Sequence, residues 1–229
     1  MKPGELPDTT SYILIKNVRE RKAEIVKEDM FETTTGRSNS DAAYFEHKTV
    51  LIPADLKRAT GGEDSADASD NMLVVADGVG GWSLQGIDPS IYSAKLTSSI
   101  VEDHLKNPNS DPKSHVRAGC AAAIDHSQGS ATAVAVKVKN EFYLTLSSIG
   151  DCGAAIFRPL KGDRLQFLYE TFPAQHMFNA PFQCGGNVDN SNAISIEGVE
   201  YMEGDIIVLY SDGFSDNVFR SGYFQCLEE

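Results

Sequence analysis

The chain has 229 residues, of which 41% are hydrophobic and 23% charged, so it can bury a sizeable core and is not a disordered protein. Its formal net charge of -13 at pH 7 would repel phosphate backbones over most of the surface, which excludes a nucleic-acid-binding protein. We expect a single domain over residues 1–229.

The N-terminal stretch, Met1 to Phe31, lacks the continuous apolar segment of a secretory signal and carries too many acidic residues for a typical transit peptide. No apolar run approaches the length that crosses a bilayer, so we expect no membrane partner. The cysteines form no CxxC pair, which favours reduced thiols in an intracellular compartment, whether the cytoplasm, a mitochondrion or a plastid. They are Cys120, Cys152, Cys184 and Cys226.

Two strands and a loop are predicted in the first part of the chain. Tyr12 to Val18 alternates like a strand, and Ala42 to Ile52 predicts a second one. Residues 53–71 are rich in Gly, Ser, Ala and acids and have no apolar period, which predicts a flexible acidic loop. Its aspartates are spaced by three, unlike the alternate ligands of an EF-hand loop, so we expect no calcium site at Asp64, Asp67 and Asp70.

A short apolar run and two helices follow. Met72 to Ala76 predicts a buried strand that delivers Asp77 to a sheet edge. Asp88-Pro89 and Asp111-Pro112 each combine an N-cap with a proline in the first turn, so each predicts a helix start. Apolar residues that recur every four positions predict the buried faces of the two helices: Tyr92, Leu96 and Ile100, then Val116, Cys120 and Ile124.

From Gly129 onward the pattern changes to strands. Four segments, at 129–138, 142–151, 152–159 and 164–169, are separated by turn signals and predict an antiparallel meander. Residues 193–213 add two further strands. Strands, two helices and strands again predict an α+β layered domain rather than a doubly wound parallel sheet.

An aspartate beside a glycine ends three of these apolar runs, at Asp77-Gly78, Gly150-Asp151 and Asp212-Gly213. One such pair is typical of an ordinary turn, whereas three at strand ends favour a cation site, because glycine lets a ligand approach the backbone. Carboxylate, carbonyl and water oxygens suit Mg²⁺ or Mn²⁺, and no His or Cys has zinc-like spacing.

In order and approximate spacing, the segments ADGVGG, GSATAVAV, SIGDCGAAIFR and GDIIVLYSDGFSDNV resemble the motifs of the metal-dependent type 2C protein serine/threonine phosphatases. The resemblance runs from about Asp41 to Val218 and is closest to a branch often found in mitochondria and plastids, which shares GVGGW and a segment like QHMFNAPFQ. It implies a four-layer α-β-β-α sandwich of two antiparallel sheets flanked by helices, with a binuclear metal centre at one end.

Five residues form the metal site that the resemblance implies. Asp77 would bridge two Mn²⁺ or Mg²⁺ ions, and Gly78 would bind one of them through its carbonyl oxygen. Asp212 would be a further ligand, and Asp77 and Asp212 would be the catalytic pair. Asp151 would help to hold a weaker additional metal, and Asp41 would act mostly through metal-bound water. Two such ions activate a water molecule without a protein nucleophile.

The implied activity is hydrolysis of phosphoserine or phosphothreonine in a phosphoprotein substrate by a monomeric enzyme. Two departures favour an alternative, a catalytically impaired pseudophosphatase that binds phosphoproteins or partners. Ser40 stands where the family usually has Glu before its early Asp, and no Asp follows Asp216, although the family's domain continues to a final metal-binding aspartate. We therefore expect a fold that is incomplete at the C-terminus, poorly stable, and weakly active or inactive.

The run from Cys152 to Arg158 also satisfies the Cys-x5-Arg pattern of cysteine-dependent phosphatases. Those enzymes curl the intervening residues around a phosphate, with the cysteine at a helix start. Here the run is typical of a strand, which would separate the two side chains by roughly 20 Å. We therefore expect no cysteine-phosphatase site.

Overall fold

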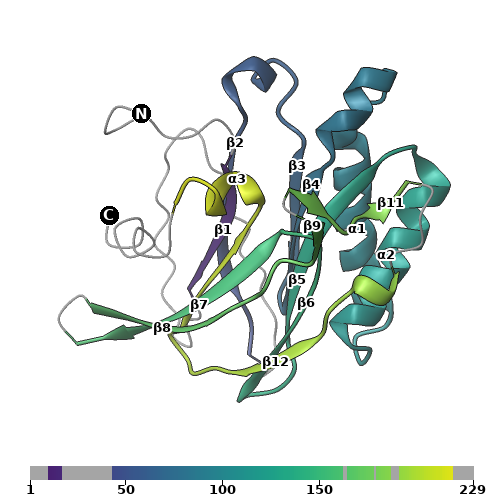
Figure 1. The fold of residues 1–229 in the computed structure, drawn as a ribbon. Helices are drawn as coiled ribbons and strands as arrows, with labels where there is room; N and C mark the ends of the chain where they lie inside the picture. Colours follow the sequence, from purple (N-terminus) through teal and green to yellow (C-terminus); the bar gives the residue numbers. More distant parts are fainter. Residues whose placement is uncertain (1–9, 17–42, 162–163, 178, 187–190, 219–229) are drawn as a thin grey trace.

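The computed structural model describes residues 10–16, 43–161, 164–177, 179–186 and 191–218. Two antiparallel sheets pack face to face in these ranges (Figure 1). The five-stranded sheet has the order β2 (Glu46–Ile52), β1 (Thr10–Lys16), β13 (Ile206–Tyr210), β7 (Gly153–Leu160), β8 (Arg164–Glu170). The six-stranded sheet has the order β12 (Glu197–Glu200), β6 (Tyr143–Ile149), β5 (Ser130–Val138), β4 (Met72–Gly78), β3 (Asp64–Ser69), with β11 (Cys184–Gly185) also paired to β5.

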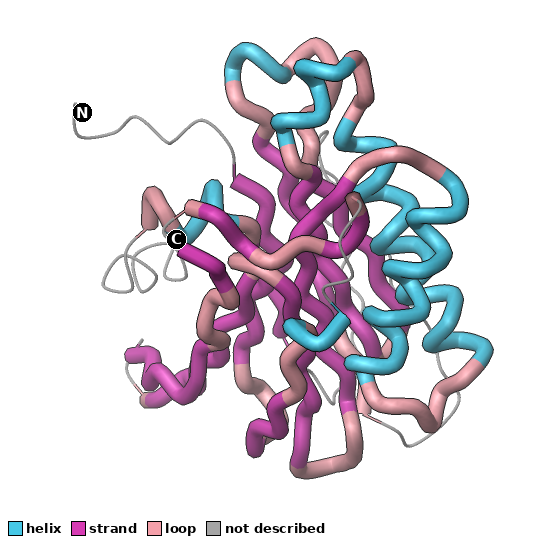
Figure 2. Tube along the Cα trace, turned by 45° about the vertical axis from the view of Figure 1, so that its right-hand side comes forward, coloured by secondary structure: helices cyan, strands magenta, loops and turns pink. Residues whose placement is uncertain are grey.

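The helices lie outside the two sheets. Both long helices cover the outer face of the six-stranded sheet, as Figures 1 and 2 show. They are α1 (Pro89–Lys106) and α2 (Pro112–His126). The remaining elements are the short helix α3 (Asp212–Ser215), the 3-10 helices η1 (Asp55–Lys57), η2 (Gly80–Gln85) and η3 (Ser191–Ala193), and a ribbon of β9 (Gln175–Met177) and β10 (Ala180–Pro181). None of the helices in the described ranges is long and apolar enough to cross a membrane.

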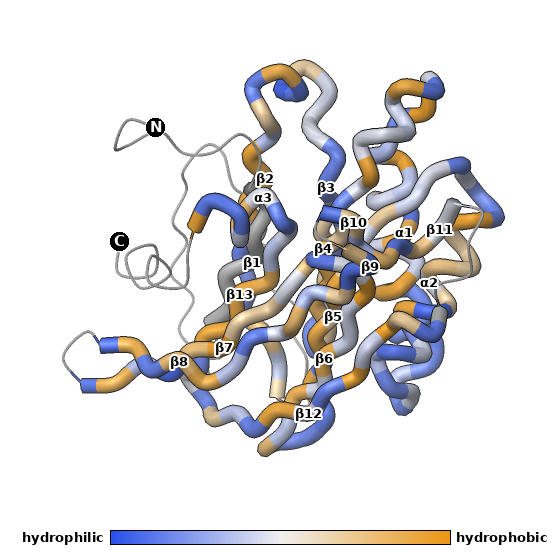
Figure 3. The backbone as a smooth tube through the Cα atoms, viewed as in Figure 1, coloured by the Kyte–Doolittle hydropathy of each residue, from blue (hydrophilic) through white to orange (hydrophobic). Residues whose placement is uncertain are grey.

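Alternation along the strands divides the buried side chains among three layers, and Figure 3 shows hydrophobic residues along the central strands. The layer between the sheets includes Leu73, Val75, Val134, Val136, Ile156, Ile207 and Leu209. The layer between the six-stranded sheet and the helices includes Met72, Val74, Ala76, Tyr92, Leu96, Ile100 and Val116. On the outer face of the five-stranded sheet, Phe214 of α3 packs with Ala155, Phe157, Val208 and Tyr210. The predicted α+β fold of two antiparallel sheets with flanking helices is confirmed.

Both predicted helix starts are confirmed. The Asp88 side chain accepts a hydrogen bond from the Ser90 backbone amide, and Asp111 caps α2 by accepting from Ser114. Each cap satisfies an amide that the first helical turn leaves without a partner.

The predicted burial of the second helix was partly wrong, because Ile124 is 51% exposed. The contact line of α2 instead passes through Gly119, where an added Cβ would lie 2.4 Å from Cγ1 of Ile100. This close approach of the two helices turns the buried face toward Val116 and Ala123 and leaves Ile124 at the surface.

The prediction of a flexible loop over residues 53–71 was also wrong. Residues 55–57 form η1, and residues 64–69 form β3, which pairs with β4 along its whole length. Ala66 and Ala68 pack against the layer between the sheets, so small side chains fill an edge strand that has no large apolar residue. The β4 ladder supplies the backbone hydrogen bonds that the composition alone does not indicate.

Two further predictions needed correction. The four segments after Gly129 are strands, but they are not one meander, because β6 and β7 belong to different sheets. Gly150, with φ of +88°, lies where the chain crosses between them. The prediction of reduced thiols was wrong for two of the cysteines, because Cys120 and Cys184 form a disulfide, whereas Cys152 keeps a free thiol. Helix α2 and β11 bring the two bonded cysteines to a Cα–Cα distance of 5.5 Å across 64 residues of sequence.

We expect Gly119→Ala to lower the free energy of unfolding by about 1 to 3 kcal/mol, because the methyl group would overlap Ile100 in a packed helix interface. Chemical denaturation monitored by circular dichroism measures the change. Gly198→Ala is the matched control, since nothing lies within 4 Å of a Cβ added at that position. Equal stability of the two variants would contradict the close packing of α1 on α2.

Candidate metal centre

The ends of the two sheets meet at a group of carboxylates. Asp77 ends β4 and is paired in register with Asp64 at the start of β3. Because side chains alternate along a strand, both have the parity of residues in the layer between the sheets, such as Val75 and Ala66. They therefore point toward the opposite sheet, where Asp212 follows the end of β13.

Hydrogen bonds across the gap hold the two sheets together at this end. Ser211, the residue before Asp212, donates from its hydroxyl to Oδ2 of Asp64 at 3.1 Å, although 147 residues separate them in sequence. Thr132 of β5 lies beside Asp77 in register, and its hydroxyl lies 3.1 Å from Sγ of the buried Cys152. These contacts position the carboxylates from both sheets.

Asp77 lies at the centre of the group. Burial raises the pKa of Asp77 well above its ordinary value, and the charges of Asp64 and Asp212 raise it further. Both neighbours also hydrogen-bond to its side chain. A divalent cation would offset the mutual repulsion of these groups, because carboxylate oxygens are preferred ligands of Mg²⁺ and Mn²⁺.

A second group of carboxylates lies on the five-stranded side of the centre. Burial and then the charge of Asp212 raise the pKa of Asp151 to about 6. The same two causes raise the pKa of Asp216 above its ordinary value. Both side chains border a cavity of about 390 Å³. Its lining also includes Cys152, Gly153, Glu170, Thr171, Phe172, Pro173, Gln175, Asn179, Tyr210, Asp212 and Ser215.

Gly78 lies where backbone segments crowd together. Its amide donates to the Glu63 carbonyl oxygen at 3.1 Å, and an added Cβ would lie 2.6 Å from the Pro89 carbonyl oxygen. The position therefore requires glycine. The Glu63 side chain lies near Gly80 and forms an ion pair with Lys57, which brings a cation to the edge of the carboxylate group.

Four of the five predicted site residues lie at this end of the sandwich, namely Asp77, Gly78, Asp151 and Asp212. Asp41 lies outside the described residues, and its role stays a prediction. Asp64 was not predicted as a site residue, because its segment was expected to be a flexible acidic loop, and it nevertheless lies against Asp77. The alternation of Asp64, Ala66 and Ala68 with polar residues is the signal that could have identified β3 and its first side chain.

The carboxylate oxygens of this group suit a hard divalent cation, although they are not spaced as they would be around a bound metal ion. Among the described residues, no three His, Cys, Asp or Glu side chains stand in a metal-binding arrangement. Asp64 and Asp212 instead each hydrogen-bond to the side chain of Asp77.

The expectation against a cysteine-phosphatase site is supported by Arg158. This side chain forms two hydrogen bonds of 2.8 Å to the carboxylate of Asp205, from Nε and Nη2. Burial raises the pKa of the Cys152 thiol well above its ordinary value, which disfavours a nucleophilic thiolate. Arg158 lies in β7 and Cys152 directly precedes this strand, and the two side chains make separate structural contacts.

Comparison with protein-family models gave no match. Among curated proteins, the chain is 36% identical to probable protein phosphatase 2C 1 of Oryza sativa subsp. japonica, over 79% of this chain and 54% of that protein. It is 35% identical to probable protein phosphatase 2C 26 of Arabidopsis thaliana, over 73% of this chain and 56% of that protein. The chain thus spans about half the length of these relatives.

One solved structure belongs to the same family as these relatives, and a second shares the fold. The photosystem II phosphatase PBCP is 32% identical and superimposes with a TM-score of 0.69, over 79% of this chain and 71% of that chain. The catalytic domain of the serine/threonine phosphatase PstP, solved with two manganese ions, is 18% identical with a TM-score of 0.55. The match covers 95% of this chain and 86% of that chain, and at this identity it supports the fold alone.

We expect Mn²⁺ to bind more tightly as pH rises from 5.5 to 7.5, by about tenfold or more, because protons held at Asp77 and Asp151 compete with the metal. The pKa of Asp151 is raised to about 6 and that of Asp77 is raised well above its ordinary value, so a larger fraction of these carboxyl groups is protonated at the lower end of this range. Titration calorimetry in two buffers of different ionisation enthalpy measures affinity and proton release together. Asp64→Asn should reduce the protons released, whereas the exposed Asp125→Asn should not; binding that is independent of pH would contradict the prediction.

We expect Arg158→Gln to destabilise the protein by about 2 to 3 kcal/mol, because it leaves the buried Asp205 carboxylate without its charged partner. Thermal unfolding measures this loss, with the exposed Arg117→Gln as a control. The rate of phosphate-ester hydrolysis per folded molecule should be the same in Arg158→Gln as in the wild type. A loss of activity without a loss of stability would restore the cysteine-phosphatase interpretation.

Proposed function

This chain belongs to the protein phosphatase 2C family, and we propose that it hydrolyses phosphoserine and phosphothreonine in proteins with the aid of two divalent metal ions. The observation that supports this activity most directly is the position of Asp77. Its side chain hydrogen-bonds to Asp64 on the neighbouring strand of the same sheet and to Asp212, which follows a strand of the other sheet. The family places metal ligands at such aspartates, and the group lies at one end of the sandwich, as the family resemblance implies.

The chain's own residues would hold the metals as follows. Asp77, Asp212 and the carbonyl oxygen of Gly78 are the proposed ligands, with Asp64 beside them, and Asp151 serves an additional ion. When bound, Mn²⁺ or Mg²⁺ supplies an activated water and offsets the charge of the phosphate. The Ser211 hydroxyl holds the Asp64 side chain in place by donating to it.

Lys57 is the proposed phosphate contact. A phosphate monoester carries negative charge toward a group of carboxylates, so a cation at the edge of the site lowers the electrostatic cost of binding. Lys57 pairs with Glu63, whose backbone carbonyl accepts from Gly78, and its side chain is 40% exposed. The ion pair keeps the ammonium group close to the site while leaving it accessible to a substrate.

The pair Glu63-Asp64 bears on the alternative of a pseudophosphatase. One reason for that alternative was Ser40, which stands where the family has Glu before its early aspartate. Glu63 directly precedes Asp64, and Asp64 hydrogen-bonds to Asp77, so this pair offers the Glu-Asp sequence that Ser40-Asp41 does not have. The proposal includes a monomeric enzyme with a single domain over residues 1–229 and a phosphoprotein substrate in an intracellular compartment.

We expect Mn²⁺-dependent hydrolysis of an aryl phosphate and of phosphoserine peptides, with activity lost on chelation. Asp77→Asn should lower kcat/KM by about a hundredfold or more, because it removes the central metal ligand. Steady-state kinetics over a range of Mn²⁺ concentrations measures the effect. Activity that survives complete chelation would sink the two-metal mechanism, and metal binding without turnover would favour the pseudophosphatase.

We expect Lys57→Met to raise KM for phosphopeptides by about tenfold, since a charge-assisted contact to phosphate is lost. Lys106→Met is the matched control, because Lys106 lies in the last turn of α1 and its side chain is 72% exposed. If both variants keep the wild-type KM, Lys57 does not contact the phosphate.

A further inference from the structure

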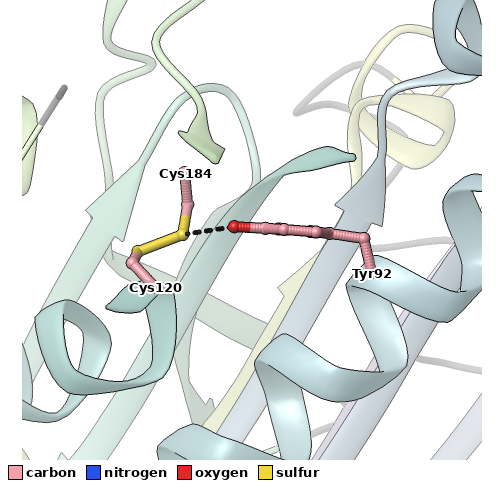
Figure 4. The surroundings of a disulfide bond; sticks show 3 residues. All are labelled: Tyr92, Cys120 and Cys184. Carbon is pink, nitrogen blue, oxygen red and sulfur yellow. Dashed lines mark hydrogen bonds between the residues drawn. A yellow bond between two sulfur atoms is a disulfide. The ribbon is translucent and has the colours of Figure 1, made fainter. Parts of the chain in front are cut away.

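The disulfide between Cys120 and Cys184 is a covalent bond between α2 and β11, and the other contacts between these two elements are non-covalent. Cys120 lies in α2, on the outer face of the six-stranded sheet, and Cys184 lies in β11 (Figure 4). β11 lies near the end of the described segment 179–186, which follows the ribbon strand β9.

Residues 174–177 and 179–186 form the region that leads to Cys184. The start of this region is attached to the Asp151 side of the candidate metal centre. The Ala174 amide donates to the Gly150 carbonyl at 2.7 Å, and Gln175 Nε2 lies 3.4 Å from Oδ2 of Asp151. Phe182 then returns to the same place, because its amide donates to the Ala174 carbonyl at 3.0 Å. Movement of this region would therefore change the surroundings of Asp151.

The end of this region is attached to the Gly78 side. The Ser130 hydroxyl donates to Oε1 of Gln183 at 2.8 Å and accepts from Nε1 of Trp82 at 2.7 Å. The Val79 amide donates to the Ser130 carbonyl at 2.9 Å, directly after Gly78. The residue next to Cys184 thus shares a hydrogen-bond network with the turn that follows the β4 aspartate.

The two sulfur atoms differ in access. Cys184 is 3% exposed and lies 3.4 Å from the hydroxyl of Tyr92, whereas Cys120 is only partly buried. Burial raises the pKa of Tyr92, so its hydroxyl keeps a proton to donate. Attack at Cys120 Sγ is therefore favoured by access, and Cys184 is the sulfur whose departing negative charge has a donor beside it.

We propose that Cys120–Cys184 is a thiol–disulfide exchange site that takes a dithiol as its co-substrate and controls how firmly residues 174–177 and 179–186 are held at the candidate metal centre. A thiolate of the dithiol attacks Cys120 Sγ, the protein S–S bond breaks, and Cys184 leaves as a thiolate that takes up a proton. The second thiol of the reagent then displaces Cys120, which also takes up a proton. The protein gains two electrons and two protons, and the reagent becomes a disulfide.

Reduction removes the covalent tie but leaves the contacts of β11 with β5 and of Cys184 with Tyr92. The fold should therefore persist while the region loosens, since only hydrogen bonds and packing then hold it. Weaker attachment at Gln175 and Gln183 would disturb both sides of the centre, so metal affinity should fall on reduction. This last consequence rests on the proposed function, whereas the exchange step and the loosening do not.

Hydrogen–deuterium exchange of the full chain, before and after treatment with dithiothreitol, tests the proposal directly. We expect exchange in peptides covering 174–186 to accelerate by about five- to tenfold on reduction, with α1 and β4 unchanged. Alkylation and mass spectrometry should find Cys120 and Cys184 blocked before treatment and free after it. Cys120→Ser should show the fast exchange without any reductant, and Cys226→Ser, which keeps the pair, should behave as wild type.

Several outcomes would overturn the proposal. Free thiols at both positions in protein prepared without reductant would show that the bond does not form, and exchange that is unchanged by reduction would show that it does not hold the region. If Cys120→Ser fails to fold, reduction of the wild-type chain still gives the answer. Titration with Mn²⁺ should show affinity several-fold weaker after reduction. If reduction accelerates hydrogen exchange but the chain hydrolyses no phosphate ester, the proposed phosphatase activity is refuted and the thiol–disulfide exchange site is still supported.

Discussion

Repulsion among carboxylates at the meeting point of the two sheets is the constraint on which the rest of the structure depends. Asp64 and Asp77 lie on adjacent strands of one sheet, and Asp212 approaches from the other, so three acidic groups share a partly buried space. Like charges at such distances raise the free energy of the folded chain unless protons or cations intervene. A site of this kind persists because the surrounding sheets hold it, and it gains stability when a cation binds.

The surrounding sheets hold the group through small and polar residues rather than large apolar ones. Gly78 allows the β4 backbone to pass between the carbonyls of Glu63 and Pro89, which places the first turn of α1 next to the site. Ser211 and Thr132 bridge the two sheets by their hydroxyl groups. Larger side chains at these positions would push the sheet ends apart and separate the aspartates, so the local composition follows from the need for close approach.

The acidic residues at this end have different surroundings, which suggests different tasks. Asp77 is enclosed by other carboxylates, while Asp151 and Asp216 border the cavity and Asp151 contacts Gln175 of the ribbon. The ribbon and β11 connect this rim to α2 through a disulfide. The positions of Asp64, Asp77 and Asp212 therefore depend on the register of the strands. The surroundings of Asp151 depend instead on the ribbon and β11, which the disulfide joins to α2.

The features that depend on local pattern could be predicted from the sequence alone. Alternation predicted most strands, the Asp-Pro pairs predicted both helix starts, and aspartates at strand ends predicted a cation site at Asp77 and Asp212. These signals are readable because each arises from residues within one or two turns or strands. They also supported the resemblance to the phosphatase family.

Only the tertiary structure decided the features that depend on pairing between distant segments. The strand β3 has no apolar pattern of its own, and pairing with β4 is what orders it and brings Asp64 to Asp77. The crossing from β6 to β7, the exposure of Ile124 and the pairing of Cys120 with Cys184 likewise follow from how sheets and helices pack. Contacts across tens of residues leave no periodic signal in one sequence, because the packing partner, not the neighbouring residues, selects the conformation.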